Sequence, residues 1–361
     1  MFWKRWFKQD RKQLENSRES SCIPSQAATA VMDTPDPLHH AQMAERRHSR
    51  DKATWFTKAE IAALKNVDSE KQLSQIISRK VPDASREEVL FRYYLSRAIY
   101  IGEFELPILP QSVAQVMNLS RDPKAEIKDY VRVIESDHSL VRAIIEVANS
   151  SFFASLSDYS SLDQAIIRIG LRQVDQITLV HALRSKVFRV RGFEDLTSSI
   201  TGHSTIAATA SRVVAEHLAG ASEGDAFLGG LFHDVGKLIL LGLVGEVQRK
   251  LSWQAGPRLV ESAFETYHVF LGEIVCSHWK FPEDLARALG AHHEPERARL
   301  HPLDASVYLG NLLAHSIEVS GTEAVCEADD PVLTGSSLDP RSLLTLREEA
   351  IDRLDAYEAL D

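Results

Sequence analysis

The chain has 361 residues, 44% of them apolar and 25% charged, which suits one large domain with appendages or two domains. Its formal net charge of −10 argues against generic nucleic-acid binding, which draws its affinity from lysine and arginine. Neither an apolar run of roughly 18 residues nor a secretory h-region occurs, and the three cysteines are too scattered for a disulfide framework. These observations predict a cytoplasmic protein without a membrane span.

Residues 1–12 combine four aromatic with five basic side chains. A helix here could make weak contact with an anionic membrane surface, although so short a helix is marginal in water and a frayed tail is the alternative. Polar residues without a sustained period continue to residue 52. We therefore expect residues 1–52 to be a disordered polar tail with a short basic and aromatic start.

Residues 53–102 carry three helical patterns, which predict a small helical lead-in: Thr57–Lys65, Glu70–Ser78 and Ser85–Tyr100. Residues 103–318 continue with helical patterns, and no segment reads convincingly as a strand. The patterns up to residue 218 lie at Gln111–Leu119, Ala125–Glu135, Ser139–Ala148, Asp163–Ile169, Arg172–Phe188 and Thr197–Leu218. We therefore expect an all-α protein.

The stretch Gly229–Leu241 has apolar residues at the spacing of one helical stripe, and it places His233 beside Asp234. In a continuous helix, Gly230 would clear space beside this pair and Lys237 would reach over it. A neutral imidazole and a carboxylate are ligands for ions such as Zn, Mn or Fe, and a lysine nearby suits a phosphate. The alternative is a histidine and an aspartate that are hydrogen-bonded to each other in a core.

The remainder of the second half is rich in histidine. His268 opens a new amphipathic pattern, His292 and His293 follow another, and Asn311 interrupts an apolar run, where its side chain must find a polar partner. One helical bundle could aim all of these side chains at a common point. For three further histidines we expect hydrogen-bonded core positions instead: His278, His301 and His315. For His315 the alternative is ligation one turn from Asn311.

Beyond residue 318 the composition turns acidic, with residues such as Glu327, Asp339 and Glu348. We expect residues 319–361 to be an acidic C-terminal tail with one helix near Pro340–Leu360. This helix should close or overhang the domain and present a solvated charged face.

The order of the polar residues resembles the HD superfamily of metal-dependent phosphohydrolases, and more closely its HDOD branch. The resemblance covers roughly residues 104–315. It rests on Leu-Pro-Ile-Leu-Pro at 106–110, Asp137-His-Ser-Leu140, Ala148-Asn149-Ser150, Asp163-Gln-Ala-Ile166, Gly230-Leu-Phe-His-Asp-Val-Gly-Lys237, His268-Val-Phe-Leu-Gly272, His278-Trp279 and His292-His293-Glu-Pro295. It implies an all-α, HDOD-type helical bundle in which an N-terminal helical lobe packs on an HD-type bundle.

The resemblance implies metal ligands at some positions of this chain, while one position departs from the family pattern. In catalytic members the equivalents of His203, His233 and Asp234 bind a metal and a later aspartate completes the site, whereas this chain has Asn311 there. Lys237 matches a lysine that would contact phosphate in an enzyme. Three further positions match extra ligands of the two-metal cyclic-dinucleotide phosphodiesterases: His268, His292 and His293. The Gly-Tyr-Pro that follows the paired histidines in those enzymes is absent here.

HDOD proteins generally serve in bacterial signal transduction, as the resemblance implies. We expect a non-catalytic regulatory protein whose HDOD domain binds other signalling proteins or senses a ligand, and which binds no nucleic acid. The alternative is a metal-dependent phosphohydrolase or phosphodiesterase. The candidate ligands for a divalent ion such as Fe, Mn, Zn or Ni are His203, His233, Asp234, His268, His292, His293 and, as a degenerate position, Asn311.

Overall fold

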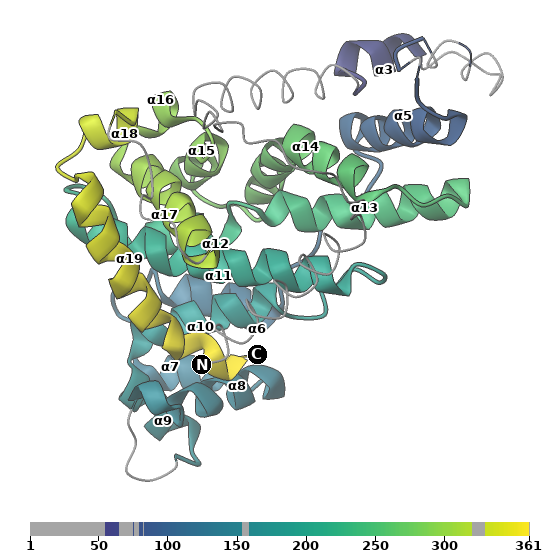
Figure 1. Ribbon diagram of the computed structural model, residues 1–361. Coiled ribbons are helices and arrows are strands. Elements are labelled where there is room, and N and C mark those ends of the chain that lie inside the picture. The colour runs from purple at the N-terminus through teal and green to yellow at the C-terminus, as the bar shows by residue number, and fades with distance from the viewer. Residues whose placement is uncertain are drawn as a thin grey trace, which may run out of the picture. The chain divides into compact units, whose positions relative to one another are not determined.

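The computed structural model describes residues 55–64, 75, 79–81, 83–153, 159–319 and 329–360. Every regular element among these residues is helical, which confirms the expected all-α fold (Figure 1). The predicted tail at residues 1–52 lies outside the described residues, and so does all but one residue of the predicted helix Glu70–Ser78.

Five helices form the N-terminal lobe. They are α6 (Gln111–Leu119), α7 (Ile127–Ile134), α8 (His138–Ala148), α9 (Leu162–Ile169) and α10 (Leu171–Leu183), with the short 3-10 helix η1 (Ser151–Phe153) after α8. Helix α8 begins at the side chain of Asp137, which accepts hydrogen bonds from the amides of Ser139 and Leu140. Gly170 separates α9 from α10 with φ of +80°, a conformation that glycine adopts without strain.

The HD-type bundle follows and is built around one long helix. Its members are α11 (Glu194–His217), α12 (Glu223–Phe232), α13 (Val235–Leu251), α14 (Pro257–His278), α15 (Glu283–Ala291), α16 (Pro295–Ala298) and α17 (Pro302–Glu318). Helix α11 packs against both α12 and α17 (Figure 1). The backbones of α11 and α17 meet closely at Gly310, where an added Cβ would lie 2.1 Å from the Oγ of Ser211. This close crossing brings His203 of α11 near Asn311 of α17.

One apolar core joins the lobe to the bundle. Ile134 and Ile166 of the lobe belong to the same buried cluster as Leu231 and Val275 of the bundle, and all four side chains are fully buried. Such a shared core stabilises both parts together, because the apolar surface of each is removed from water by the other. The N-terminal lobe thus packs on the bundle, as expected.

The lead-in consists of α3 (Lys58–Leu64) and α5 (Arg86–Ile101). It is fixed to α14 by two buried polar contacts. The indole Nε1 of Trp55 donates to Ser262 Oγ at 3.0 Å, and the hydroxyls of Ser96 and Tyr267 lie 2.7 Å apart. The lead-in therefore covers the face of α14 that carries Ser262 and Tyr267.

The C-terminal segment comprises α18 (Pro331–Thr334), α19 (Pro340–Leu354) and the 3-10 helix η2 (Asp355–Leu360). It closes the domain, as expected. Its apolar stripe is buried, however: Leu343 and Leu354 are almost fully enclosed, and Tyr357 retains only 2% of its exposure. The outer side of α19 carries exposed charged residues such as Glu348 and Asp352, in keeping with the expected solvated charged face, whereas the buried inner stripe was not anticipated.

The segment Glu223–Leu251 is long and apolar enough to cross a membrane when judged by length and composition alone. It comprises two helices, α12 and α13, and 83% of its most apolar window is buried inside the fold. Its apolar character is therefore accounted for by packing in the protein core.

Candidate metal centre

The predicted continuous helix through Gly229–Leu241 divides at the His233-Asp234 pair, so this expectation is wrong. Helix α12 ends at Phe232 and α13 begins at Val235. In an unbroken helix the carbonyl of Gly230 would accept the amide N–H of Asp234. The Nδ1 of His233 lies 2.7 Å from that carbonyl oxygen and takes this place. The interruption sets both side chains in the bundle interior, where His233 is 1% and Asp234 2% exposed.

Two glycines control how closely other helices approach this pair. A Cβ on Gly236 would lie 1.9 Å from the carbonyl oxygen of His268, so the absence of a side chain lets α14 reach α13. Gly230, expected to clear space beside the pair, instead faces α11, where its Cβ would lie 2.5 Å from the carbonyl oxygen of Ala207. The close packing at Gly236 therefore lets α14 bring His268 near Asp234.

The Asp234 carboxylate lies at the centre of the site and faces two groups of imidazoles. Its Oδ1 lies 3.6 Å from His268 Nε2 and 3.9 Å from His292 Nε2. Its Oδ2 lies 3.3 Å from His233 Nε2 and 4.0 Å from His203 Nε2. One carboxylate thus contributes an oxygen to each of two ligand groups.

The inner group consists of Asp234, His268, His292 and His293, and we call it the inner cluster. Their ligand atoms all lie within 4.8 Å of one another. The Nε2 of His268 lies 3.2 Å from that of His292 and 3.1 Å from that of His293. Ligands that share an ion at about 2.1 Å lie roughly 3.0–3.5 Å apart, so these separations match a common ion.

Backbone carbonyls fix the ring orientations. The Nδ1 of His233 donates to Gly230 O at 2.7 Å, that of His268 to Phe264 O at 2.6 Å, and that of His292 to Leu289 O at 2.5 Å. Each Nε2 is therefore unprotonated, and its lone pair is directed into the site. Metal-binding histidines are usually oriented in this way.

The site contains buried polar atoms without partners, which is the strongest indication that it could hold a cation. The Nε2 of His233 and the Oδ1 of Asp234 are buried and form no hydrogen bond. The lone pairs of His268 and His292 also face each other across 3.2 Å. A divalent cation in the inner cluster would satisfy the lone pairs of Asp234, His268 and His292, so the residues present fit a metal ion.

The electrostatics favour the metal-binding form of each group. Burial lowers the pKa of His268 to about 4, and burial also lowers the pKa values of His233 and His292. Burial alone would raise the pKa of Asp234, but His233 and Lys237 outweigh it and hold this pKa well below its usual range. The site therefore offers neutral imidazoles and an ionised carboxylate, which are the forms that bind metals.

The side of the site that contains His203 is different, because this ring is held by two oxygens. Its Nε2 lies 3.0 Å from Asn311 Oδ1, and its Nδ1 lies 3.0 Å from Glu318 Oε1. Burial alone would lower the pKa of His203, but the Glu318 carboxylate outweighs it and raises this pKa. Both ring nitrogens of His203 are therefore engaged by neighbouring oxygens, while the ring stays within ligand distance of His233 and Asp234.

Sequence reasoning missed Glu318. It supplies a second carboxylate, but on the outer side of the His203 ring, away from Asp234. Burial alone would raise the pKa of Glu318, but His203 and His315 lower it to about 2. The signal was present in the sequence, since Asn311, His315 and Glu318 are spaced i, i+4 and i+7 on one helical stripe.

The remaining candidates lie at the edge. Lys237, expected to reach over the His-Asp pair, places its Nζ 2.6 Å from Asp234 Oδ2. The expectation of hydrogen-bonded core positions for three other histidines is wrong, because all three are exposed: His278, His301 and His315. His278 ends α14 and His301 precedes α17, whereas His315 lies within α17 and its ring centroid is 4.6 Å from that of His203. The seven predicted ligand positions do come together; their role as ligands stays a prediction.

Comparisons with known proteins identify the family and the fold of this chain. A family model described as HDOD domain matches residues 106–295. No curated protein matches. A Shewanella amazonensis structure, provisionally named a metal-dependent phosphohydrolase, is 18% identical with a TM-score of 0.56, and the match covers 76% of this chain and 100% of that one.

Two further solved structures share the fold. An HDOD domain protein of unknown function from Geobacter sulfurreducens is 19% identical with a TM-score of 0.53, over 73% of this chain and 97% of that one. A Marinobacter aquaeolei protein, provisionally named a signal transduction protein, is 22% identical with a TM-score of 0.51, over 86% of this chain and 67% of that one. At this identity the likenesses establish the helical fold.

Proposed function

Because this chain belongs to the HDOD domain family, we propose that it is a bacterial signal-transduction protein whose HDOD domain regulates partners without catalysing a reaction. The observation that carries the proposal is the state of His203. Its ring is held between Asn311 and Glu318 at 3.0 Å each. Asp234 is then the one carboxylate of the inner cluster, because Glu318 contacts the other nitrogen of the His203 ring, and two-metal hydrolysis needs more anionic charge than that.

In this proposal, the inner cluster binds one divalent ion. Asp234, His268, His292 and His293 would hold it, and His233 would lie beside it. When bound, such an ion supplies Lewis acidity and a fixed positive charge. Its role here is to link α13, α14 and α15, because its ligands come from the ends or faces of these three helices. An ion of the kind Fe, Mn, Zn or Ni suits a donor set dominated by imidazole.

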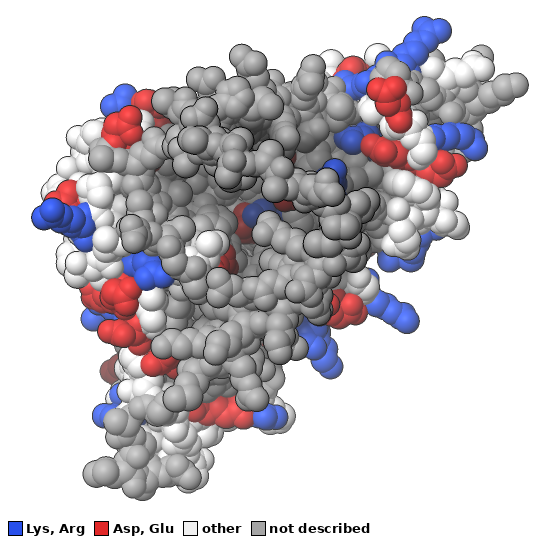
Figure 2. Space-filling model, in the orientation of Figure 1, with Lys and Arg blue, Asp and Glu red and all other residues white. Residues whose placement is uncertain are grey.

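The partners in this proposal are other signalling proteins. Among the described residues on the face in Figure 2, basic and acidic side chains are interspersed. Together with the net charge of −10, this supports a partner other than nucleic acid.

A cytoplasmic location belongs to the same proposal and is supported by Cys276, which is buried without a disulfide partner. A membrane contact through residues 1–12 concerns a segment outside the described residues.

The test combines metal analysis with an activity screen on the purified full chain. Elemental analysis should find about one divalent ion per chain, since one group of neutral imidazoles with a carboxylate is available. Bis(p-nitrophenyl) phosphate, mononucleotides and cyclic dinucleotides should not be turned over in the presence of Mn²⁺, Fe²⁺ or Zn²⁺. Rapid turnover that disappears in Asp234→Asn would overturn the non-catalytic assignment.

The second candidate is a metal-dependent phosphohydrolase, and the geometry of the inner cluster favours it. All four of its members place ligand atoms within 4.8 Å, and Lys237 lies at the edge of the site, where a phosphate would arrive. The Shewanella amazonensis protein named above shares this fold. The activity screen decides between the two candidates, because metal binding alone is expected from both.

A further inference from the structure

A further group of ligand atoms lies on the outer side of the His203 ring, away from Asp234. The atoms belong to His203 of α11 and to His315 and Glu318 of α17, and they all lie within 4.8 Å of one another. We call these three residues the outer cluster. Two imidazoles and one carboxylate are a ligand set that suits Zn, Fe or Ni, so the outer cluster has the chemistry of a metal site.

The geometry of the outer cluster follows from the crossing of two helices. His315 and Glu318 are spaced i and i+3 at the end of α17, so their side chains leave the helix on the same side. The Nδ1 of His203 lies 3.0 Å from Glu318 Oε1, which matches the roughly 3.0–3.5 Å between ligands that share an ion. The Nδ1 of His315 lies 3.7 Å from Glu318 Oε2, a distance that a small rotation of this exposed side chain closes.

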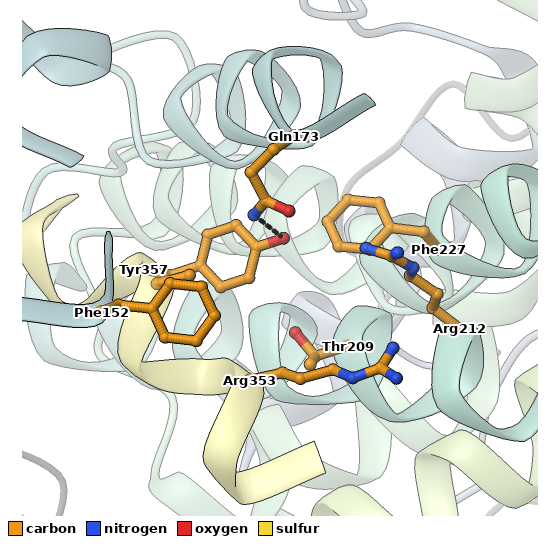
Figure 3. Close-up of a pocket in the computed structure, with 8 residues that line it drawn as sticks. Phe152, Gln173, Thr209, Arg212, Phe227, Arg353 and Tyr357 are labelled. Atoms are coloured by element: carbon orange, nitrogen blue, oxygen red, sulfur yellow. Dashed lines mark hydrogen bonds between the residues drawn. The ribbon is translucent and has the colours of Figure 1, made fainter. Parts of the chain in front are cut away.

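The end of α17 that carries the outer cluster is held in place by the C-terminal segment. Arg347 of α19 donates from its Nε to the hydroxyl of Ser316 and from its Nη2 to the carbonyl of Ser316, both at 3.2 Å. The segment itself is anchored to the N-terminal lobe, where the hydroxyl of Tyr357 accepts a hydrogen bond from Gln173 at 3.1 Å (Figure 3). The last turn of α17 is therefore ordered before any ion arrives, which lowers the entropic cost of binding one.

Asn311 sets the orientation of the His203 ring toward the outer cluster. The carboxamide Oδ1 of Asn311 accepts a hydrogen bond from His203 Nε2 at 3.0 Å. In metal sites one ring nitrogen of a histidine usually donates to such an oxygen, and the other nitrogen binds the ion. The Nδ1 of His203 is therefore the ligand atom here. An ion that binds to it takes the place of a proton, which is released to solvent.

The outer cluster is more open than the inner cluster and has its own negative charge. The side chain of His315 is 56% exposed and that of Glu318 is 22% exposed, whereas the side chain of His292 is fully buried. The Glu318 carboxylate balances one charge of a divalent ion, and the partial negative charge at the C-terminal end of α17 adds to it. An ion in the outer cluster would therefore exchange with solvent far more readily than one in the inner cluster.

We propose that the outer cluster is a second metal site, which binds an exchangeable divalent ion such as Zn²⁺ or Ni²⁺. The ion is held by His203 Nδ1, His315 Nδ1 and the Glu318 carboxylate, and water fills the remaining positions. Because this open site releases its ion during gel filtration, elemental analysis of the purified chain counts the inner ion alone. Occupancy links α11 to the end of α17 and makes their crossing respond to the concentration of free ion. Only this regulatory consequence rests on the proposed function; the binding itself does not.

Isothermal titration calorimetry with Zn²⁺ tests the proposal on the full chain, after the chain has been loaded with Zn²⁺ and gel-filtered. The inner cluster keeps its ion under these conditions, so the titration should show one further saturable binding event, accompanied by release of a proton. A second gel filtration should remove this ion again. Absence of a saturable event up to millimolar Zn²⁺ would overturn the proposal.

Variants locate this binding event. His315→Ala removes an exposed ligand and Glu318→Gln removes the charge, and each should raise the dissociation constant of the event at least about tenfold. His301→Ala and Glu348→Gln alter an exposed histidine and an exposed carboxylate outside the cluster, and these matched controls should bind as the parent does. A rise below about tenfold in either ligand variant, or an equal rise in the controls, overturns the proposal. His293→Ala weakens the inner cluster and should leave this event unchanged, which separates failure of the outer cluster from failure of the proposed function.

Discussion

The Nε2 atoms of His268 and His292 lie 3.2 Å apart, and each ring is committed to donating from its Nδ1 to a backbone carbonyl. Two lone pairs therefore face each other in a buried space. In water such lone pairs would accept hydrogen bonds, so their burial without donors costs free energy. A cation bound between them would remove this cost, and the site should therefore have a high affinity for a metal ion.

Removal of one ligand should weaken metal binding while the fold survives. His293 lies at the exposed rim of the inner cluster, so His293→Ala removes a ligand without opening a core cavity. We expect the dissociation constant for Zn²⁺ to rise by at least about 10–100-fold, the range that even outer positions of metal sites show. Competition with a chromophoric chelator measures it. His278→Ala, at an exposed histidine outside the cluster, is the control, and an equal loss there would contradict the assignment.

A second carboxylate beside His203 should create a second metal position. Asn311→Asp replaces the Oδ1 that lies 3.0 Å from His203 Nε2 with a charged oxygen facing the same site as Asp234. We expect the metal content at saturation to rise from one to two ions per chain, because hard divalent cations favour carboxylates. Elemental analysis after gel filtration gives the count. Asn311→Ser, which adds no charge, should stay at one; an unchanged count in Asn311→Asp speaks against the role given to Asn311.

Two glycines of α13 should respond to alanine in opposite directions. Gly236→Ala sets a Cβ 1.9 Å from His268 O, so α14 must move away, at a cost of at least about 1–3 kcal/mol in the free energy of unfolding. Gly242 has nothing within 4 Å of its Cβ position, and Gly242→Ala should stabilise the helix by about 0.5–1 kcal/mol. Urea denaturation of the metal-free protein measures both changes. Gly236→Ala should also weaken metal binding, because His268 moves with α14; retention of full affinity would contradict this coupling.

Stability should fall as the pH rises from about 4 to about 7 because of Asp175 in the N-terminal lobe. Its Oδ1 is buried without a hydrogen-bond partner, and burial raises the pKa of this carboxyl group to about 7. The folded state therefore holds a proton that the unfolded chain releases near pH 4, so this contribution is fully present below pH 4 and lost above pH 7. Asp175→Asn should remove the dependence and add about 2–4 kcal/mol at pH 8.

Thermal unfolding across this pH range is the measurement for Asp175→Asn. The matched variant Asp352→Asn alters an exposed carboxylate of α19 and should keep the parent profile. A parent whose stability rises between pH 4 and pH 7, with no difference in Asp175→Asn, would exclude Asp175 as the origin.

Helical periodicity was enough to predict most of the fold. Gln111–Leu119 was predicted with the bounds that the structure has, and Asp163–Ile169 differs by one residue at its start. The break at His233 could not be read from apolar spacing, because a side-chain hydrogen bond to Gly230 O produces it while the stripe continues on both sides. Periodicity reports which face is buried, whereas this break depends on one polar contact.

The sequence allowed us to expect that the site residues come together, but not that His203 is held by Asn311 and Glu318, unlike the inner cluster. The histidines were found because imidazoles are conspicuous among apolar residues. Glu318 was missed because a glutamate at the end of a helix is usually solvated, and its contact with His203 joins residues 115 positions apart in sequence. Such long-range pairing depends on how α11 crosses α17 at Gly310, and no local pattern encodes that crossing.

The anchoring of His233, His268 and His292 to carbonyls three or four residues earlier in their own chain segments affects how quickly an ion can be captured. The entropy of ordering these rings is lost during folding, before any ion arrives. Capture then requires little rearrangement of the protein, and the slow step is the shedding of water by the incoming ion. Ions that exchange their hydration shells rapidly should therefore load faster than those that hold water tightly, whatever their final affinity.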